Sequence, residues 1–178
     1  MHTPNAKFLT PLAIVSAALL AVSGGLASAA GTPAGGEIHL YEADTATAGS
    51  VGTAILTGAI TDYGTDNQGI AGGGTINELD LQKGSFRVDV GKLSNKLNFP
   101  VDSQTCSSAG SATAPVPIVK GSGTGAYIGI SGTFVTRVTV AGIQPRLGDG
   151  DADDACDLSA SNGPGVLFGS GSGTLAFK

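Results

Sequence analysis

The stretch GSGTGAYIGISGTFVTRVTV, residues 121–140, decides the fold class because its apolar side chains recur at every second position. The apolar series consists of Ile128, Ile130, Phe134, Val138 and Val140. Most of the residues between them are small, polar or charged, so one face of a β-strand would lie in a core and the other would face solvent or a partner. Gly132 interrupts the series, which is typical of a bend, a bulge or a tight turn.

The segments upstream of this stretch show the same period of two. Alternating apolar residues predict three strands, at residues 37–42, 75–81 and 85–90. A short connection at residues 82–84 joins the last two strands as a β-hairpin. Residues 53–63 form a further predicted strand, apolar on both faces, with a bend at Gly58. Residues 64–74 are rich in turn residues and are predicted as a loop at the mouth of a barrel.

The remaining segments show weaker patterns. Residues 91–100 either continue a strand or form one helical turn, and residues 101–114 are predicted as a polar loop. Residues 116–119 form a short strand that Pro117 confines to the edge of a sheet. The chain ends with a long loop at residues 141–164 and two short apolar pieces at residues 166–168 and 174–177. Many short strands with glycine turns predict an all-β domain, either a closed barrel or a sandwich.

The N-terminus has the features of a secretory signal peptide. Lys7 precedes a mostly apolar run at residues 8–22, and Ala-Ser-Ala at residues 27–29 matches a small-x-small cleavage site. The alternative, a membrane anchor, is disfavoured because the run is shorter than the ~20 residues that a membrane span needs. We expect a secreted protein without stable membrane insertion after cleavage. The expected division is a signal-peptide helix at residues 1–29, a flexible leader at residues 30–36 and a β-barrel domain at residues 37–178.

Composition limits the classes of partner. The chain has 178 residues, a formal net charge of −5 and 14 acidic residues, all downstream of residue 29. A sparsely charged, acidic surface disfavours nucleic acids and anionic membranes as partners. The 29 glycines are more than twice the usual share of ~7%. They punctuate the alternating segments, as turns, bulges and barrel corners do.

The two cysteines, Cys106 and Cys156, predict a disulfide because a single pair in an exported protein is normally oxidised. Closing a loop of ~50 residues would stabilise the fold by about 4 kcal/mol in the chain-entropy model. The alternative is a reactive thiol pair, which is disfavoured because CxxC spacing and a neighbouring basic residue are both absent.

The densest cluster of candidate ligands is GDGDADDACD, residues 148–157. Its alternating Asp149, Asp151 and Asp153 offer the oxygen ligands that Ca²⁺ prefers. The EF-hand pattern is excluded because its glycine and glutamate positions hold Asp154 and Ala160. The segment is therefore either a calcium site or a solvated acidic loop held by the second cysteine, and we expect no other cofactor.

Two pairs of residues are candidates for acid–base chemistry. His39 and Tyr41 share one face of a strand, where they either transfer protons or lie at the surface. Asp62 and Tyr63 stand at a strand end, and the alternative for the aspartate is to cap the following turn.

The known catalytic motifs are absent, including the GxSxG elbow, HExxH, the P-loop and the dinucleotide fingerprint. Arg87 and Arg137 lie opposite the apolar faces of their strands. They would line the barrel interior if those faces pack outward, and they face solvent otherwise, which is the favoured interpretation.

Several segments resemble the allene oxide cyclase and dirigent superfamily, including secreted actinobacterial members. These are GAITDY at residues 58–63, LQKGSFRVDV at 81–90, GTGAYIGISGT at 123–133 and a terminal strand at 173–175. The resemblance implies an antiparallel β-barrel of eight strands with an internal cavity, often trimeric or dimeric in plants. Plant allene oxide cyclases close an unsaturated fatty-acid epoxide into a ring, and dirigent proteins steer radical coupling. The catalytic positions of these families have no residue-by-residue match in this chain.

Three functions follow as hypotheses. The favoured one is a small secreted β-barrel that binds an apolar or amphipathic small molecule. The others are an enzyme of cyclase or isomerase type, and an oligomeric structural or cell-surface interaction module. A titratable residue buried in an apolar cavity would favour the enzyme, and a cavity without one would favour binding. A filled barrel beside an exposed apolar patch would favour the interaction module.

Overall fold

A computed structural model describes residues 35–45, 51–71, 74–148, 155–158 and 164–178. The expected signal peptide, most of the expected leader and the three candidate calcium ligands (Asp149, Asp151 and Asp153) lie outside the described residues. No helix among the described residues is long and apolar enough to cross a membrane.

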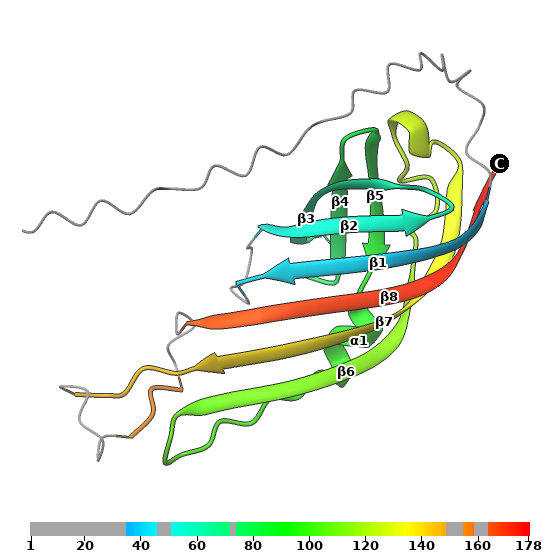
Figure 1. Ribbon diagram of the computed structural model, residues 1–178. Helices are drawn as coiled ribbons and strands as arrows, with labels where there is room; N and C mark the ends of the chain where they lie inside the picture. Colours follow the sequence, from blue (N-terminus) through cyan, green and yellow to red (C-terminus); the bar gives the residue numbers. More distant parts are fainter. Residues whose placement is uncertain (1–34, 46–50, 72–73, 149–154, 159–163) are drawn as a thin grey trace, which may run out of the picture. The chain divides into compact units, whose positions relative to one another are not determined.

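The described chain is almost entirely β-structure, which confirms the predicted all-β class. Its strands are β1 (Gly36–Asp44), β2 (Val51–Gly58), β3 (Asp62–Ala71), β4 (Ile76–Leu81), β5 (Gly84–Asp89), β6 (Ser107–Pro117), β7 (Ile130–Ile143) and β8 (Gly165–Phe177). All eight form one antiparallel sheet in the order β5-β4-β3-β2-β1-β8-β7-β6, which curls into an incomplete barrel (Figure 1). The two helical segments are α1 (Gly91–Lys96) and the 3₁₀ helix η1 (Gly125–Tyr127).

The two edge strands, β5 and β6, meet near the end of the barrel that carries η1. Val88 on β5 forms an antiparallel bridge with Ile118, just after β6. The Val119 amide donates to the Arg87 carbonyl at 2.8 Å, and the Thr124 amide donates to the Ser85 carbonyl at 2.8 Å. These bonds close one end of the barrel.

Strand β7 is the clearest case of the predicted alternation. Phe134, Val138 and Val140 are buried and the residues between them include the exposed Val135 and Arg137. The strand begins at Ile130, two residues later than the apolar series suggested. Ile128 follows η1 and is 69% exposed, so its predicted place in the inward-facing series is wrong.

The single strand predicted at residues 53–63 is wrong, because the chain turns after Gly58 and forms β2 and β3. Gly58 has φ +103°, and a Cβ there would lie 2.5 Å from the Glu37 carbonyl oxygen. Much of the loop predicted at residues 64–74 is β3. The sequence concealed this strand because its inward positions include Asp62 and Asp66 instead of apolar residues.

Strands β6 and β8 were only partly predicted for a related reason, because small residues replace large apolar ones along most of their length. The loop predicted at residues 101–114 is largely β6, whose inward positions include Ala112 and Ala114. The edge position predicted for the short strand at residues 116–119 is confirmed, because its first two residues are the end of β6, an edge strand. The two terminal apolar pieces and the Gly/Ser run between them form the single strand β8. A Cβ at Gly173 would lie only 2.1 Å from the Thr133 carbonyl oxygen.

The hydrophobic core fills the barrel toward its closed end. Its largest side chains with less than 2% exposure are Tyr127, Phe86 and Phe134. The rings of Phe86 and Tyr127 meet edge to face with centroids 5.4 Å apart. Aromatic pairs of this geometry add about 0.5–1.5 kcal/mol beyond the area that they bury.

The predicted disulfide between Cys106 and Cys156 is confirmed, with Cα atoms 5.4 Å apart. Cys106 immediately precedes β6, and Cys156 belongs to the connection between β7 and β8. The bond therefore ties this connection to the start of an edge strand.

Candidate functional site

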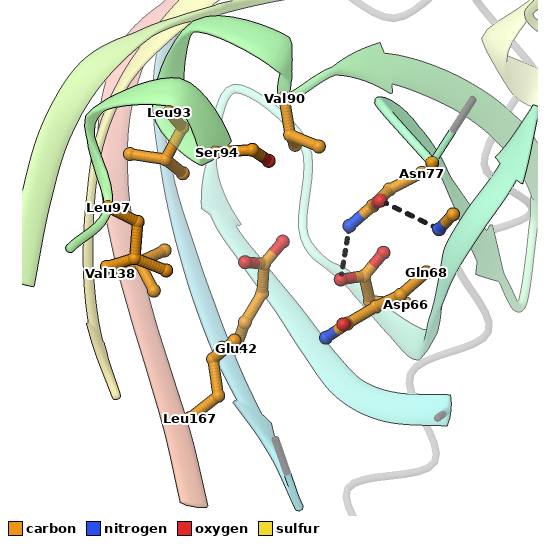
Figure 2. A pocket seen from close by; sticks show the side chains of 12 residues that line it. Glu42, Asp66, Gln68, Asn77, Val90, Leu93, Ser94, Leu97, Val138 and Leu167 are labelled. Carbon is orange, nitrogen blue, oxygen red and sulfur yellow. Dashed lines mark hydrogen bonds between the residues drawn. The ribbon is translucent and has the colours of Figure 1, made fainter. Parts of the chain in front are cut away.

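A cavity of about 330 Å³ occupies the mouth of the barrel, beside α1 (Figure 2). One of its walls is apolar and consists of Val90, Leu93, Leu97, Val138 and Leu167. The facing wall is polar and includes Glu42, Asp66, Gln68 and Asn77. The barrel is thus hollow at its mouth.

The strand period explains how Glu42 comes to face this cavity. Ile38 and Leu40 point into the core from β1, and Glu42 is the next residue on the same face. Glu42 lies opposite Gly169 of β8 in the sheet register. A Cβ at Gly169 would lie 2.6 Å from the Glu42 carboxylate, so this glycine leaves the space that the carboxyl group occupies.

Asp66 is the most deeply buried polar residue of the cavity wall, with 3% exposure. Asn77 Nδ2 donates a hydrogen bond to Asp66 Oδ2 at 3.0 Å, and Asn77 Oδ1 accepts one from the Gly69 amide at 3.2 Å. Asp66 Oδ1 is buried and has no hydrogen-bond partner in the described protein. Since buried carboxylate oxygens normally accept hydrogen bonds, this oxygen is an unusual unsatisfied group.

The environment raises the pKa of both carboxyl groups. Burial and then the nearby charge of Asp66 raise the pKa of Glu42 from 4.5 to about 8. Burial raises the pKa of Asp66 from 3.8 to about 6; the hydrogen bond from Asn77 opposes this rise and the charge of Asp44 adds to it. At neutral pH Glu42 is therefore mainly protonated and Asp66 mainly ionised.

Asp62 lies on the same strand as Asp66 but has a full set of partners. Its Oδ2 accepts hydrogen bonds from the Tyr127 hydroxyl at 2.5 Å and the Lys83 amide at 3.1 Å. Its Oδ1 accepts one from the Tyr63 amide at 2.9 Å. Burial and the hydrogen bond that the Tyr127 hydroxyl donates to Asp62 raise the pKa of Tyr127 above its usual value. Asp62 therefore joins β3 to the closed end of the barrel and is not part of the cavity.

The other sequence candidates lie on the outer surface. Tyr41 is half exposed, and His39 Nε2 lies 3.7 Å from Glu37 Oε1 on the same outer face of β1. Arg87 Nε lies 3.5 Å from Glu78 Oε2 and is solvent-facing, as is Arg137. The favoured interpretation of the two arginines is confirmed.

Metal binding finds no support in the part of the chain that the structure describes. Those residues contain no group of three or more His, Cys, Asp or Glu side chains that could hold an ion. The predicted calcium ligands remain a prediction, since they lie beyond the described ranges.

Sequence reasoning did not identify the two carboxyl groups of the cavity. For Glu42 a signal existed, because it continues the inward series of Ile38 and Leu40. For Asp66 the signal was absent, because the polar sequence of β3 resembles a loop.

Comparison with protein-family models, with curated proteins and with solved structures gives no significant match for this chain.

Proposed function

We propose that this protein is a secreted β-barrel that binds an amphipathic small molecule in its mouth cavity. The observation that carries the proposal is one cavity of about 330 Å³ with an apolar wall facing a wall that bears two carboxyl groups. This volume falls within the usual range for small-molecule sites, ~300–1,000 Å³. The N-terminal signal-peptide features and the disulfide support secretion, and the curled sheet of eight strands suits the resemblance to the allene oxide cyclase and dirigent superfamily.

The two walls assign different roles to the two parts of a ligand. Leu93, Leu97 and Val138 would cover an apolar body, which gains ~25 cal/mol for each Å² removed from water. Glu42, protonated at neutral pH, would donate or accept a hydrogen bond at the polar end. A few polar groups in an apolar pocket fix the orientation of a ligand in this way.

Native mass spectrometry tests the binding function. The wild-type protein would be purified from the medium of its own host and also exposed to an organic extract of that culture. We expect a small-molecule adduct that disappears on denaturation. Leu167→Trp fills the cavity and should abolish the adduct, whereas Val166→Trp, the adjacent outward-facing position on β8, should retain it. A wild-type protein without an adduct under both conditions would contradict the proposal.

A second candidate function is proton-transfer catalysis by Glu42 and Asp66. The pKa values of about 8 and about 6 leave one acid and one base in the same cavity at neutral pH. Environments that separate the pKa values of two carboxyl groups are typical of acid–base pairs. Asp66 would remove a proton from a carbon of the ligand while Glu42 returns one elsewhere, which gives an isomer with the same atoms and electrons.

Deuterium exchange distinguishes this catalysis from binding alone. The retained ligand would be incubated with the protein in D₂O and analysed by mass spectrometry. Catalysis predicts deuterium on carbon, or an isomer, with wild-type protein, and neither with Glu42→Gln or Asp66→Asn. A ligand recovered unchanged from the wild-type protein would leave binding as the function and exclude the catalytic role.

A further inference from the structure

We propose that the mouth cavity selects an amphipathic cation, a primary or secondary amine with an apolar body. This inference rests on the proposed binding function and names the chemical class of its ligand. It follows from the charges on the cavity wall and from one unsatisfied buried oxygen.

The charges that face the cavity are all acidic. Glu42 from β1 and Asp66 from β3 line it directly, and Asp44 lies close enough for its charge to raise the pKa of Asp66. The lining residues of β4, β7, β8 and α1 carry no charge, and neither do Val90 and Leu97, which flank α1. The basic residues of α1 are exposed, and Lys96 Nζ donates to the Thr113 carbonyl at 3.3 Å. The described wall therefore presents carboxyl groups and no cation to balance them.

The second observation is the missing hydrogen bond at Asp66. This side chain is 97% buried and lines the cavity, yet Asn77 satisfies only its Oδ2 and leaves Oδ1 without a donor. Figure 2 shows the Glu42 carboxyl group between Asp66 on one side and Leu93 and Leu97 on the other. An ammonium group has three donors and no acceptor, so it matches a wall that has more acceptors than donors. Hydrogen bonds of this kind, between two charged groups, are among the strong ones.

A fatty acid would meet the opposite conditions. Its carboxylate would lie beside Asp66 and Glu42, and like charges in a partly buried site raise each other's pKa values and disfavour binding. The cavity thus favours a different charge class from the fatty-acid epoxide of the plant allene oxide cyclases. A cationic headgroup without an apolar body would leave the side chains of Leu93, Leu97 and Val138 uncovered. The ligand is therefore expected to carry an apolar body as well as the cation.

Binding of an amine should also release protons. Glu42 is mainly protonated at pH 7 in the empty cavity, and a cation beside it favours the ionised form. The complex should therefore lose up to about one proton per amine bound at pH 7, by linkage between the two equilibria. A bound carboxylate should cause proton uptake instead.

Isothermal titration calorimetry at pH 7 would compare octylamine, octanol and octanoate, which share a chain and differ in charge. Titrations in two buffers of different ionisation enthalpy would report the proton exchange. We expect octylamine to bind at least about tenfold more tightly than octanol, the ratio given by one hydrogen bond to a charged group. Octanoate should bind most weakly, and octylamine binding should release protons.

Three variants locate the effect. Glu42→Gln and Asp66→Asn should each remove most of the preference for octylamine over octanol while leaving octanol affinity nearly unchanged. Glu37→Gln is the matched control, because Glu37 lies on the outer face of β1 with its side chain 76% exposed. Its selectivity should equal that of the wild-type protein. Retained octanol binding shows that the cavity variants remain folded.

The outcomes separate the two proposals. Octanol or octanoate binding as tightly as octylamine would overturn the preference for a cation and leave barrel binding intact. Full selectivity in both cavity variants would overturn it as well. Failure of all three compounds to bind the wild-type protein, together with the absence of a native adduct, would overturn the binding function itself.

Discussion

Two aspartates on β3, four residues apart, show how the two ends of the barrel differ. Asp62 and Asp66 both face inward, with 5% and 3% exposure. Asp62 accepts hydrogen bonds from three donors, whereas Asp66 accepts one and keeps an unsatisfied oxygen. The same residue type on the same strand is thus a structural link where the barrel is filled and, under the proposed function, a ligand contact where it is hollow.

The packing around each aspartate explains the difference. At the closed end Tyr127 stacks edge to face on Phe86 and brings its hydroxyl to Asp62. At the mouth Asn77 is the one side chain that donates to Asp66 among the described contacts, and Gly169 leaves the space that the neighbouring Glu42 carboxyl group occupies. The core packs at the closed end, and the Cys106–Cys156 disulfide ties the connection between β7 and β8 to the start of β6.

The largest predicted effect comes from removing that tether. The double variant Cys106→Ser/Cys156→Ser should lower the free energy of unfolding by about 4 kcal/mol, because the unfolded chain regains the entropy of a loop of ~50 residues. Urea denaturation of both proteins under non-reducing conditions measures the difference. A loss below about 1 kcal/mol would show that the mouth does not depend on the disulfide.

The dependence of stability on pH should also be large. The folded state holds protons on Glu42 and Asp66 that the unfolded chain releases above pH 4.5 and 3.8. Because the unfolded state binds fewer protons across this window, these two groups make stability fall as pH rises toward about 8. The loss should be several kcal/mol for the pair, because each pKa unit corresponds to about 1.36 kcal/mol.

A matched variant isolates this contribution from the other titrating groups. Glu42→Gln/Asp66→Asn should be less sensitive to pH between 5 and 8 than the wild-type protein, as measured by urea denaturation at each pH. Parallel profiles for the two proteins would contradict the raised pKa values.

At the closed end, Asp62→Asn should destabilise the fold by about 2 kcal/mol at pH 7. The asparagine keeps one acceptor oxygen but replaces Oδ2 with an amide NH2 group. The Lys83 amide and the Tyr127 hydroxyl both donate to Oδ2, so a buried donor loses its acceptor. Chemical denaturation measures the change. Asp80→Asn, on the exposed face of β4, is the control and should change stability by less than about 0.5 kcal/mol.

At the mouth, the same substitution should act in the opposite direction. Burying the charge of Asp66 costs free energy in the folded state, and this charge also disfavours ionisation of Glu42. Asp66→Asn removes the charge and should stabilise the empty protein by about 1 kcal/mol at pH 7. Denaturation beside Asp62→Asn compares the two ends directly. Equal destabilisation by both substitutions would remove the distinction between a structural and a ligand-binding aspartate.

The sequence predicted those parts of the fold whose inward positions are large and apolar. The hairpin of β4 and β5 and the body of β7 follow from residues such as Leu79, Phe86 and Phe134. Strand β3 and most of β6 and β8 were missed because their inward positions hold residues such as Asp66, Ala112 and Gly169, which give no hydrophobic period. Cysteine pairing was predictable because two cysteines in a chain with signal-peptide features allow one intramolecular bond.

The candidate site was less predictable than the fold. Its lining comes from segments between residues 42 and 167, so the cavity exists only once distant strands and α1 have assembled. Glu42 could have been selected as a charged residue in an inward series, but the shift of its pKa depends on Asp66. That neighbour is 24 positions away in sequence and two strands away in the sheet, a relation that follows from register and not from spacing.

The most direct test of the contrast between the two ends is a carbon-13 NMR titration of the side-chain carboxyl groups in the ligand-free protein. Glu42 should titrate with an apparent pKa of about 8 and Asp66 with one of about 6. Addition of octylamine should lower both values. Titration of both groups near 4.5 and 3.8, with no response to the amine, would show that the mouth carboxyl groups are ordinary solvated side chains and would contradict the assignment of the cavity as the ligand site.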